Sequence, residues 1–345
     1  MLQKAVINAL KKPETYDEEV LYVKMLQTHI SYVFLTGRFA YKIKKPVNFG
    51  FLDFTTLDKR KFYCKEEVRL NRRLCGDMYL GVLPITSFED IIKVNGFGDI
   101  VEYTVKMREM PQEALMSELL KKGKISLGII DKIARILSDF HKKAETSEEI
   151  EKYGSISVVK FNWDENFDQT RSFVGKTMNL EDFCFIHDAV QEFLKNRRDL
   201  FDLRIKEGKI RECHGDLHSR NIFVVNDKIY IYDAIEFNKR FRYSDVASDI
   251  AFLLMDLEFL GRSDLSNRFL NKYLEYSREK EDFLEVLPFY KCYRAYVRGK
   301  VTSFKMNDPN IAGEEKRESI KIARRYFKMS REYAERMRRI SEQIS

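Results

Sequence analysis

The sequence predicts an α+β protein with a small β-rich N-terminal lobe and a larger, mostly helical C-terminal lobe. Three observations support this prediction. The chain has 345 residues, which is more than one small core accommodates. Short apolar runs separated by turn residues precede about residue 107, and apolar residues at helical spacing follow it. A polar loop at residues 214–221 leads into two short apolar runs joined by a tight turn.

The N-terminal region is expected to contain one short helix and then three strands. Residues 1–12 read as the helix, which ends near Pro13. The strands are expected at Val20–Leu26, Ser31–Leu35 and Phe39–Lys44. Because side chains alternate along a strand, Lys42 and Lys44 of the third strand share one face. An alternative is that both lysines only solvate one face of an edge strand.

The segment Lys59–Leu74 has the composition and spacing of a helix. One face carries Tyr63, Glu67, Leu70 and Leu74, whereas Glu66 lies on a mostly polar face. Glu67 is therefore an inward-facing carboxylate, and such a group needs a partner. Lys42 is the candidate partner, and Lys44 is the runner-up that would be tested if Lys42 and Glu67 were not coupled.

The first lobe is expected to occupy residues 1–107. It ends with a strand at Ile100–Met107, which Pro111 and the residues before it interrupt. The second lobe is expected at residues 108–305, followed by a helical extension at 306–345. Its helices are predicted at Ile125–Ala144, Phe183–Glu207, Asp245–Leu260, Phe289–Phe304 and Glu314–Ser345, with a less regular stretch at Tyr153–Asn179.

The polar loop His214–Asn221 is the strongest functional signal. The chain then continues through two apolar strands, joined by a turn at Asn226-Asp227, and the second strand delivers Asp233. Such a hairpin holds Asp216, Asn221 and Asp233 beside one pocket. Phosphoryl transfer needs this set of groups, because one carboxylate orients the acceptor hydroxyl while an amide and a second carboxylate hold magnesium.

Two other interpretations of the loop stay open. Cys213, His214 and His218 could be ligands of a zinc ion, although no further Cys or His cluster completes a tetrahedral site. The loop could also be an ordinary polar turn, which would leave the joint presence of Asn221 and Asp233 unexplained.

The loop resembles the H-G-D-x-H-x-x-N motif of the aminoglycoside-phosphotransferase-like family, within the protein-kinase-like superfamily. The resemblance covers about residues 20–305 and implies a two-lobed kinase-like fold. It also implies that Asp216 is the catalytic base and that Asn221 and Asp233 bind Mg²⁺. Glu236 could be an additional metal ligand. Asp245 resembles the family's structural aspartate, which braces the catalytic loop.

The resemblance also assigns nucleotide-binding residues. Ala40-Tyr41-Lys42 is similar to the V-A-I-K pattern, whose lysine contacts the α- and β-phosphates of ATP, and the family carries an acid at the position of Glu67. The glycine-rich loop of protein kinases is missing between the first two strands, so the hydroxyl of Ser31 or of Thr28 would have to contact the phosphates. Met107 and the residues up to Met110 would line the adenine slot at the hinge.

The implied activity is Mg-ATP-dependent phosphorylation of a hydroxyl on a small molecule. A protein serine/threonine kinase is one alternative, although the chain lacks the A-P-E activation segment. A nucleotide-binding partner without turnover is the other. Trp163, Tyr293, Arg294 and Arg298 suit a compact polar acceptor. Lys291, Arg294 and Arg298 share a helix face and could bind an anionic acceptor or pair with buried acids.

Composition limits the partners and the location. The net charge of +7 permits nucleotide binding without demanding nucleic acid. Five scattered cysteines without a C-x-x-C pair favour reduced thiols in the cytoplasm. No long uncharged apolar run predicts a membrane span, and the N-terminal residues do not resemble a signal peptide. His141, after the first helix of the second lobe, is expected to be a packing or surface residue.

Overall fold

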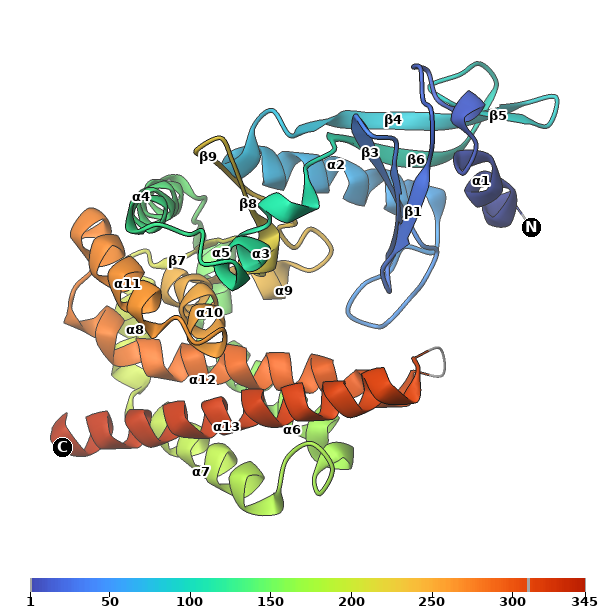
Figure 1. The fold of residues 1–345 in the computed structure, drawn as a ribbon. Helices are drawn as coiled ribbons and strands as arrows, with labels where there is room; N and C mark the ends of the chain where they lie inside the picture. The colour runs from blue at the N-terminus through green and yellow to red at the C-terminus, as the bar shows by residue number, and fades with distance from the viewer. Residues whose placement is uncertain (1, 309–310, 345) are drawn as a thin grey trace. The chain divides into compact units, whose positions relative to one another are not determined.

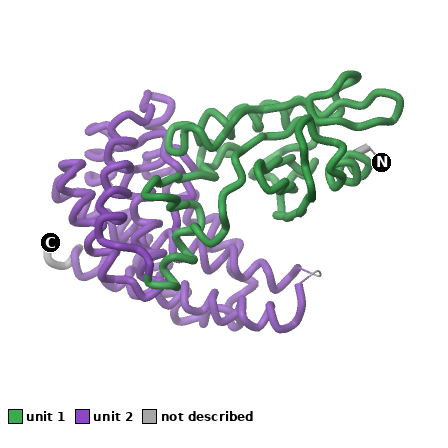
Figure 2. The backbone as a smooth tube through the Cα atoms, turned by 45° about the horizontal axis from the view of Figure 1, so that its top comes forward, with its two compact units in different colours: residues 1–123, 220–241 green, residues 124–219, 242–345 purple. Residues whose placement is uncertain are grey.

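The computed structural model describes residues 2–308 and 311–344. The chain forms two compact units, coloured separately in Figure 2. Unit 1 comprises residues 1–123 and 220–241, and unit 2 comprises residues 124–219 and 242–345. The domain boundaries predicted after residues 107 and 305 stay a prediction. Met1 and Ser345, the outer ends of the predicted terminal helices, lie outside the described residues.

Unit 1 is built on one antiparallel sheet, shown in blue and blue-green in Figure 1. Its strands are β1 (Lys24–Gln27), β2 (Ser31–Leu35), β3 (Phe39–Lys44), β4 (Tyr79–Phe88), β5 (Ile91–Val94) and β6 (Asp99–Arg108). Their order is β1-β2-β3-β6-β4-β5, so β3 is an interior strand rather than an edge strand. The predicted second and third strands are confirmed at their predicted bounds, whereas the first begins only at Lys24.

The two faces of this sheet bury different sets of side chains. On one face, Tyr41 and Ile43 of β3 pack with Val6 and Leu10 of α1 (Leu2–Leu10). On the other face, Ala40 and Met107 are buried beside α2 (Leu57–Cys75), which packs against β4 and β6. Because side chains alternate along β3, this second face also receives the two lysines of the strand.

The remaining elements of unit 1 follow β6 or come from the returning segment. These are α3 (Met116–Lys121), β8 (Ile222–Val225), β9 (Lys228–Ile231) and most of α9 (Lys239–Arg242). The helix α2 begins where Thr56 accepts a hydrogen bond from the Lys59 backbone N–H, which satisfies a free donor of its first turn. Its bounds contain the helix predicted at Lys59–Leu74.

Unit 2 is mostly helical, as predicted. Its helices are α4 (Leu127–Lys143), α5 (Glu148–Glu151), α6 (Ile156–Thr170), α7 (Leu180–Asn196), α8 (Arg198–Lys206), α10 (Val246–Phe259), α11 (Ser263–Ser277), α12 (Glu281–Phe304) and α13 (Gly313–Ile344). A two-stranded sheet joins β7 (Ile210–Glu212) to β10 (Tyr243–Asp245). The long helices α12 and α13 pack along each other.

Two helix predictions for unit 2 need correction, and a further helix was missed. The helix predicted at Phe183–Glu207 is divided into α7 and α8 at Arg197, whose guanidinium pairs with Glu285. The helix predicted from Phe289 begins eight residues earlier and continues through Pro288. Burial of apolar side chains on both sides of this proline outweighs the loss of one backbone hydrogen bond. The helix α11 was not predicted.

The single tryptophan, Trp163 on α6, is fully buried. Its ring stacks on Phe167, with centroids 5.2 Å apart, and meets Tyr293 and Tyr296 edge-on at 5.3 and 5.4 Å. The expectation that Trp163 suits contact with a polar acceptor is therefore wrong, because the side chain belongs to the aromatic core of unit 2.

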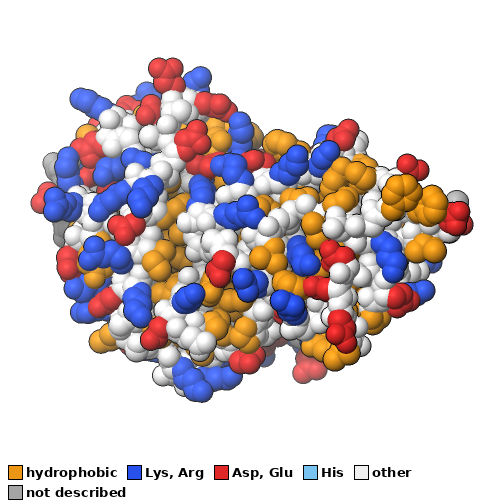
Figure 3. All heavy atoms as spheres, turned by 90° about the horizontal axis from the view of Figure 1, so that it is seen from above, with side chains coloured by type: hydrophobic (Ala, Val, Ile, Leu, Met, Phe, Trp, Pro, Cys, Tyr) orange, Lys and Arg blue, Asp and Glu red, His pale blue; other side chains and the backbone are white. Residues whose placement is uncertain are grey.

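The mixed charge of the surface and the free cysteines match what the composition predicts. On the face drawn in Figure 3, Lys and Arg side chains are interleaved with Asp and Glu. All five cysteines are described, and all are free thiols. Among the helices of the described residues, none has the length and apolarity required to cross a bilayer.

Candidate active site

The β8–β9 hairpin of unit 1 holds two of the predicted metal ligands at its open end. Asn221 directly precedes β8, and one residue, Tyr232, separates Asp233 from the end of β9. The backbone N–H of Tyr232 donates to Asn221 O at 3.0 Å, so the ladder brings the two ends together. Asn226 and Asp227 both have positive φ, as a two-residue turn of this hand requires. The predicted turn is therefore confirmed.

Asp233 sits in a constrained backbone segment. Its φ is +64°, in the left-handed region that few residues other than glycine adopt. The next residue is held by α2, because Ala234 N donates to Asn71 Oδ1 at 2.9 Å. Asn71 Nδ2 in turn donates to Glu67 O at 2.8 Å. The segment that carries Asp233 is thereby attached to the helix that carries Glu67.

Two lysines and three carboxylates form a charge cluster in unit 1. Glu67 Oε1 lies 2.8 Å from Lys42 Nζ, and Glu67 Oε2 lies 2.8 Å from Lys44 Nζ. Lys42 also contacts Asp233 Oδ1 at 2.8 Å, and Lys44 also pairs with Glu236. The ion pair predicted between Lys42 and Glu67 is present, and the second candidate, Lys44, shares the same carboxylate.

The ionisation of this cluster follows from its contacts. Burial lowers the pKa of Lys42, but Asp233 and Glu67 raise it more, so the net pKa lies well above the ordinary lysine value. Burial raises the pKa of Glu67, but Lys42 and Lys44 lower it below the ordinary glutamate range. For Glu236, burial outweighs the attraction of Lys44 and raises the pKa. Glu67 is therefore a firmly ionised buried carboxylate.

The two lysines differ in exposure. The Lys44 side chain is fully buried, whereas that of Lys42 retains 13% of its accessible surface. Asp233 is 44% exposed, and Glu236 only 5%. Lys42 and Asp233 are thus the members of the cluster that a ligand can reach, while Lys44 and Glu236 form its interior.

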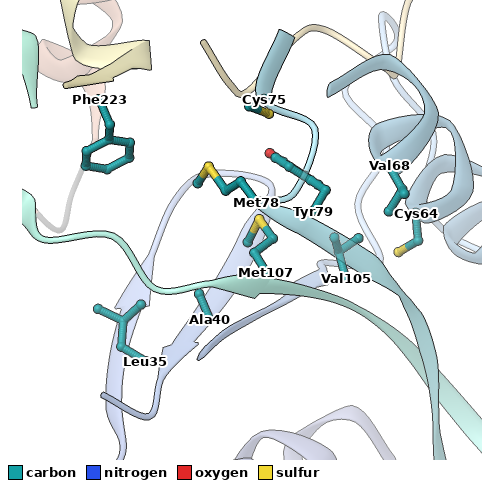
Figure 4. Packing of buried hydrophobic residues seen from close by; sticks show 10 residues of the cluster. All are labelled: Leu35, Ala40, Cys64, Val68, Cys75, Met78, Tyr79, Val105, Met107 and Phe223. Atoms are coloured by element: carbon teal, nitrogen blue, oxygen red, sulfur yellow. The ribbon is translucent and has the colours of Figure 1, made fainter. Parts of the chain in front are cut away.

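The other two predicted nucleotide residues are both buried. Met107 lies in an apolar cluster with Ala40, Met78 and Phe223, drawn in Figure 4. Ser31 has a fully buried hydroxyl without a hydrogen-bond partner, and its backbone N–H donates to Thr28 Oγ1 at 3.0 Å. The contact of Ser31 with phosphate therefore stays a prediction.

The loop that carries Asp216 lies in unit 2 and is braced by α10 and α12. Asp249 accepts hydrogen bonds from the backbone N–H groups of His214 at 3.0 Å and Gly215 at 2.9 Å. Arg294 Nη1 donates to Gly215 O at 2.9 Å. At the end of the loop, Ser219 N donates to Asp256 Oδ2 at 2.9 Å. These contacts fix the backbone on both sides of Asp216.

This geometry corrects the role expected for Asp245. The bracing aspartate is Asp249, one helical turn further along. Asp245 instead caps the N-terminus of α10, accepting from Ala247 N, and pairs with the buried Arg204 at 2.6 Å. The sequence pattern contained both aspartates, and only the direction of their side chains separates the two roles.

His141 was not assigned to the site from sequence. Its imidazole is buried, with Nδ1 2.9 Å from the Tyr273 hydroxyl and Nε2 3.2 Å from Asp249 Oδ2. His141, Cys213 and Asp249 are the one group in the described chain whose ligand atoms lie close enough for a metal ion. The group does not include His214 or His218, so the zinc site considered from sequence is not assembled among these residues.

Asp216 is ionised in this environment. Burial raises the pKa of its carboxyl, but His218, Arg298 and His214 lower it more, and the net pKa lies below the ordinary aspartate range. His218 Nε2 is 3.4 Å from Asp216 Oδ2. The carboxylate therefore suits orienting a hydroxyl group, and it is a weak base.

Comparison with known proteins gives relatives of unassigned function. No family model matches the chain. Uncharacterized proteins from Mycobacterium bovis and from two strains of Mycobacterium tuberculosis are each 35% identical to it over 301 residues. The matched region is 87% of this chain and 59% of each relative, so the chain spans about three fifths of their length.

Solved structures resemble the chain over nearly all of its length. A choline/ethanolamine kinase family protein from Mesorhizobium loti is 12% identical, with a TM-score of 0.51, covering 96% of this chain and 100% of that one. A microcompartment-associated aminopropanol kinase is 14% identical, with a TM-score of 0.51 and coverages of 97% and 98%. The chain has the kinase-like α+β fold of these proteins, as the resemblance to the aminoglycoside-phosphotransferase-like family implied.

Replacing Glu67 should destabilise the protein through its buried lysines. Glu67→Gln leaves two ammonium groups without their shared carboxylate, which typically costs about 3–5 kcal/mol. The neighbouring Glu66, which is half-buried and pairs with the more exposed Arg69 at 2.9 Å, provides the control: losing such a solvent-accessible pair in Glu66→Gln should change the free energy of unfolding by less than about 1 kcal/mol. Urea unfolding at neutral pH measures both values.

The pH dependence of this difference has a defined sign. Because the pKa of Glu67 is depressed in the folded state, its stabilisation is present above the ordinary glutamate pKa of 4.5 and is lost as the pH falls below that value. The difference between Glu67→Gln and the unmodified protein should therefore shrink in acid. Equal effects of the two glutamine substitutions at neutral pH would contradict the cluster.

Proposed function

We propose that this chain is a phosphotransferase that moves the γ-phosphoryl group of ATP to a hydroxyl of a small molecule. The observation that carries the proposal is the contact of Lys42 with both Glu67 and Asp233 in unit 1. A lysine held by an inward helix carboxylate, next to a metal-binding aspartate, is the arrangement that phosphoryl transfer uses. The kinase fold of the similar structures supports the same reaction class.

Lys42 is proposed to contact the ATP phosphates, because it is the more accessible of the two cluster lysines. Lys44 then acts indirectly, by holding Glu67 and Glu236. The apolar cluster around Ala40 and Met107 suits the adenine ring, and the turn between β1 and β2 near Ser31 suits the phosphates. Because Met107 and Ser31 are buried, ATP binding would require side chains to move in the apolar cluster and in the β1–β2 turn.

Asn221 and Asp233 are proposed to hold Mg²⁺. Amide and carboxylate oxygens are the ligands that this ion prefers, and the β8–β9 ladder keeps the two residues at one end of the hairpin. The bound ion would neutralise charge on the ATP phosphates. Glu236 is a poor additional ligand, because Lys44 already occupies its carboxylate in the interior of the cluster.

Asp216 is proposed to accept the proton of the acceptor hydroxyl. The acceptor oxygen forms a bond to the γ-phosphorus, the bond from that phosphorus to the β-bridging oxygen breaks, and ADP leaves. In a loose transition state the proton moves late, so a carboxylate with a depressed pKa is sufficient to orient the hydroxyl.

The short connection after Asp233 favours a small acceptor over a protein. Only residues 234–245 separate this aspartate from the start of α10, and four of them form the helical turn α9. This connection lacks the length of the platform on which protein kinases hold an extended peptide. A nucleotide-binding protein without turnover is a further alternative, which the variants below distinguish.

Metal should be required for nucleotide binding. Asp233→Ala should weaken ATP binding far more in magnesium than in EDTA, because it removes a proposed ligand of the ion while Lys42 keeps its pairing with Glu67. Calorimetric titration measures both affinities. Glu113→Ala, at an exposed acid of unit 1, should leave both unchanged. Equal ATP affinity of the unmodified protein with and without magnesium would refute the metal assignment.

Asp216→Asn should retain ATP affinity within a few-fold and lose about 10²–10⁴-fold in turnover. The protein is incubated with γ-labelled ATP and a metabolite extract or, separately, a protein extract. Label should appear on a small molecule and disappear with Asp216→Asn. Label that appears only on protein, and depends on Asp216, would favour the protein-kinase alternative. A folded variant that no longer binds ATP would contradict the role of Asp216.

A further inference from the structure

The helix α12 presents three cationic side chains toward α10 and the Asp216 loop: Lys291, Arg294 and Arg298. Two of them are occupied by structural contacts. Lys291 is buried and lies 2.5 Å from Glu258 Oε1, whose carboxylate also accepts from Ser266 at 2.8 Å. Lys291 is therefore the partner of a buried acid, and it is not available to a ligand.

Arg294 is occupied by backbone oxygens. Its Nη1 donates to Gly215 O at 2.9 Å and its Nε donates to Ser248 O at 3.1 Å. The residue is buried, and these contacts join α12 to the loop directly before Asp216. Arg294 is thus a residue that positions the loop, and its guanidinium has little capacity left for an acceptor molecule.

Arg298 differs from both. It follows Arg294 by one helical turn, on the same face of α12, and is half-buried. Because Arg294, one turn earlier on this face, donates to Gly215 O at 2.9 Å, Arg298 lies near the loop that carries Asp216, and its charge contributes to the low pKa of that carboxyl. Its hydrogen-bonding side-chain partner is the Tyr326 hydroxyl. Burial lowers the pKa of Arg298, but Tyr326 and the charges of Asp216 and Asp256 help to raise it.

The surroundings hold Arg298 in place without using all of its donors. Its Cζ lies 5.6 Å from the centroid of the Tyr326 ring, which is itself buried and stacked on Phe259 with centroids 3.9 Å apart. A guanidinium has five N–H donors in a planar fork, and Tyr326 supplies one oxygen. The nearby Asp256 carboxylate already accepts from Ser219 N.

We propose that Arg298 is an acceptor-binding residue, and that the phosphate acceptor carries an anionic group, a carboxylate or a phosphate, that pairs with it. This inference rests on the proposed phosphotransferase function. A half-buried guanidinium with spare donors matches the geometry of an oxyanion. The position beside Asp216 places the acceptor's anionic group near its reacting hydroxyl. An ammonium group at the same place would meet the like charge of Arg298.

The charge class of the acceptor is tested with a fractionated extract. Metabolites are separated by ion exchange into cationic, neutral and anionic pools, and each pool is incubated with the full chain, magnesium and γ-labelled ATP. Labelled product should form from the anionic pool. Product only from the cationic or neutral pool would overturn the inference and leave the phosphotransferase intact. Label in none of the pools would contradict the proposed function itself.

The role of Arg298 is tested with the acceptor found in this way and with an ester derivative that masks its anionic group. Arg298→Gln should raise KM for the free acceptor about 10- to 100-fold, as expected for a lost hydrogen bond to a charged group. The variant should then bind the free acceptor and its ester with similar affinity. Arg298→Lys keeps the charge and should lose less. Circular dichroism verifies that both variants fold.

The matched control is Arg325→Gln. Arg325 is an exposed residue on α13, next to Tyr326, and donates to Phe259 O at 2.9 Å. This variant removes the same charge from the same region and should leave KM within two-fold. If Arg298→Gln instead impairs turnover equally with the free and the esterified acceptor, Arg298 serves the transferred phosphoryl group or Asp216 itself, and the acceptor assignment is overturned.

Discussion

The interaction on which unit 1 depends is the sharing of Glu67 between Lys42 and Lys44. Burying three charges is costly, so each must be held by opposite charges in good geometry. Glu67 binds one lysine with each oxygen, and the lysines then reach Asp233 and Glu236 on the segment after β9. These ion pairs join three parts of unit 1: strand β3, helix α2 and the segment after β9. Separating any of these parts would leave buried charges unpaired. The same constraint leaves Lys42 and Asp233 as the accessible members.

In unit 2, hydrogen bonds with neighbouring side chains hold the catalytic-loop candidate at residues 214–219, which has little regular structure. The loop at 214–219 donates its backbone N–H groups to Asp249 and Asp256, and Arg294 satisfies the Gly215 carbonyl. Buried carboxylates that accept backbone N–H groups are strongly stabilised as anions. Burial raises the pKa of Asp249, but His141 and the loop N–H groups lower it more. Ionised Asp249 therefore braces the loop that carries Asp216, the carboxylate that we propose orients the acceptor hydroxyl.

Much of this was predictable from local patterns. The polar loop, the turn at Asn226-Asp227 and the alternation of β3 are short-range features, and the inward position of Glu67 follows from helical spacing. The brace was not predictable, because Asp245 and Asp249 both lie at the start of the apolar helix α10 and only tertiary contacts select between them. Lys44 was ranked second to Lys42, although alternation places both on one face. Whether both lysines contact Glu67 depends on the conformations of their side chains, which the strand pattern does not specify. The helix predicted from Phe289 begins at Glu281, because burial of apolar side chains on both sides of Pro288 outweighs the backbone hydrogen bond that this proline removes.

The measurement that most directly tests the role of the cluster is amide hydrogen exchange in residues 232–238 of the ligand-free protein, compared between Glu67→Gln and Glu66→Gln. If the lysines hold this segment through Glu67, exchange at residues 232–238 should accelerate in Glu67→Gln, although the substitution lies more than 160 residues earlier in the sequence. Glu66→Gln should exchange like the unmodified protein. Unchanged protection of these residues in a folded Glu67→Gln variant would contradict the account.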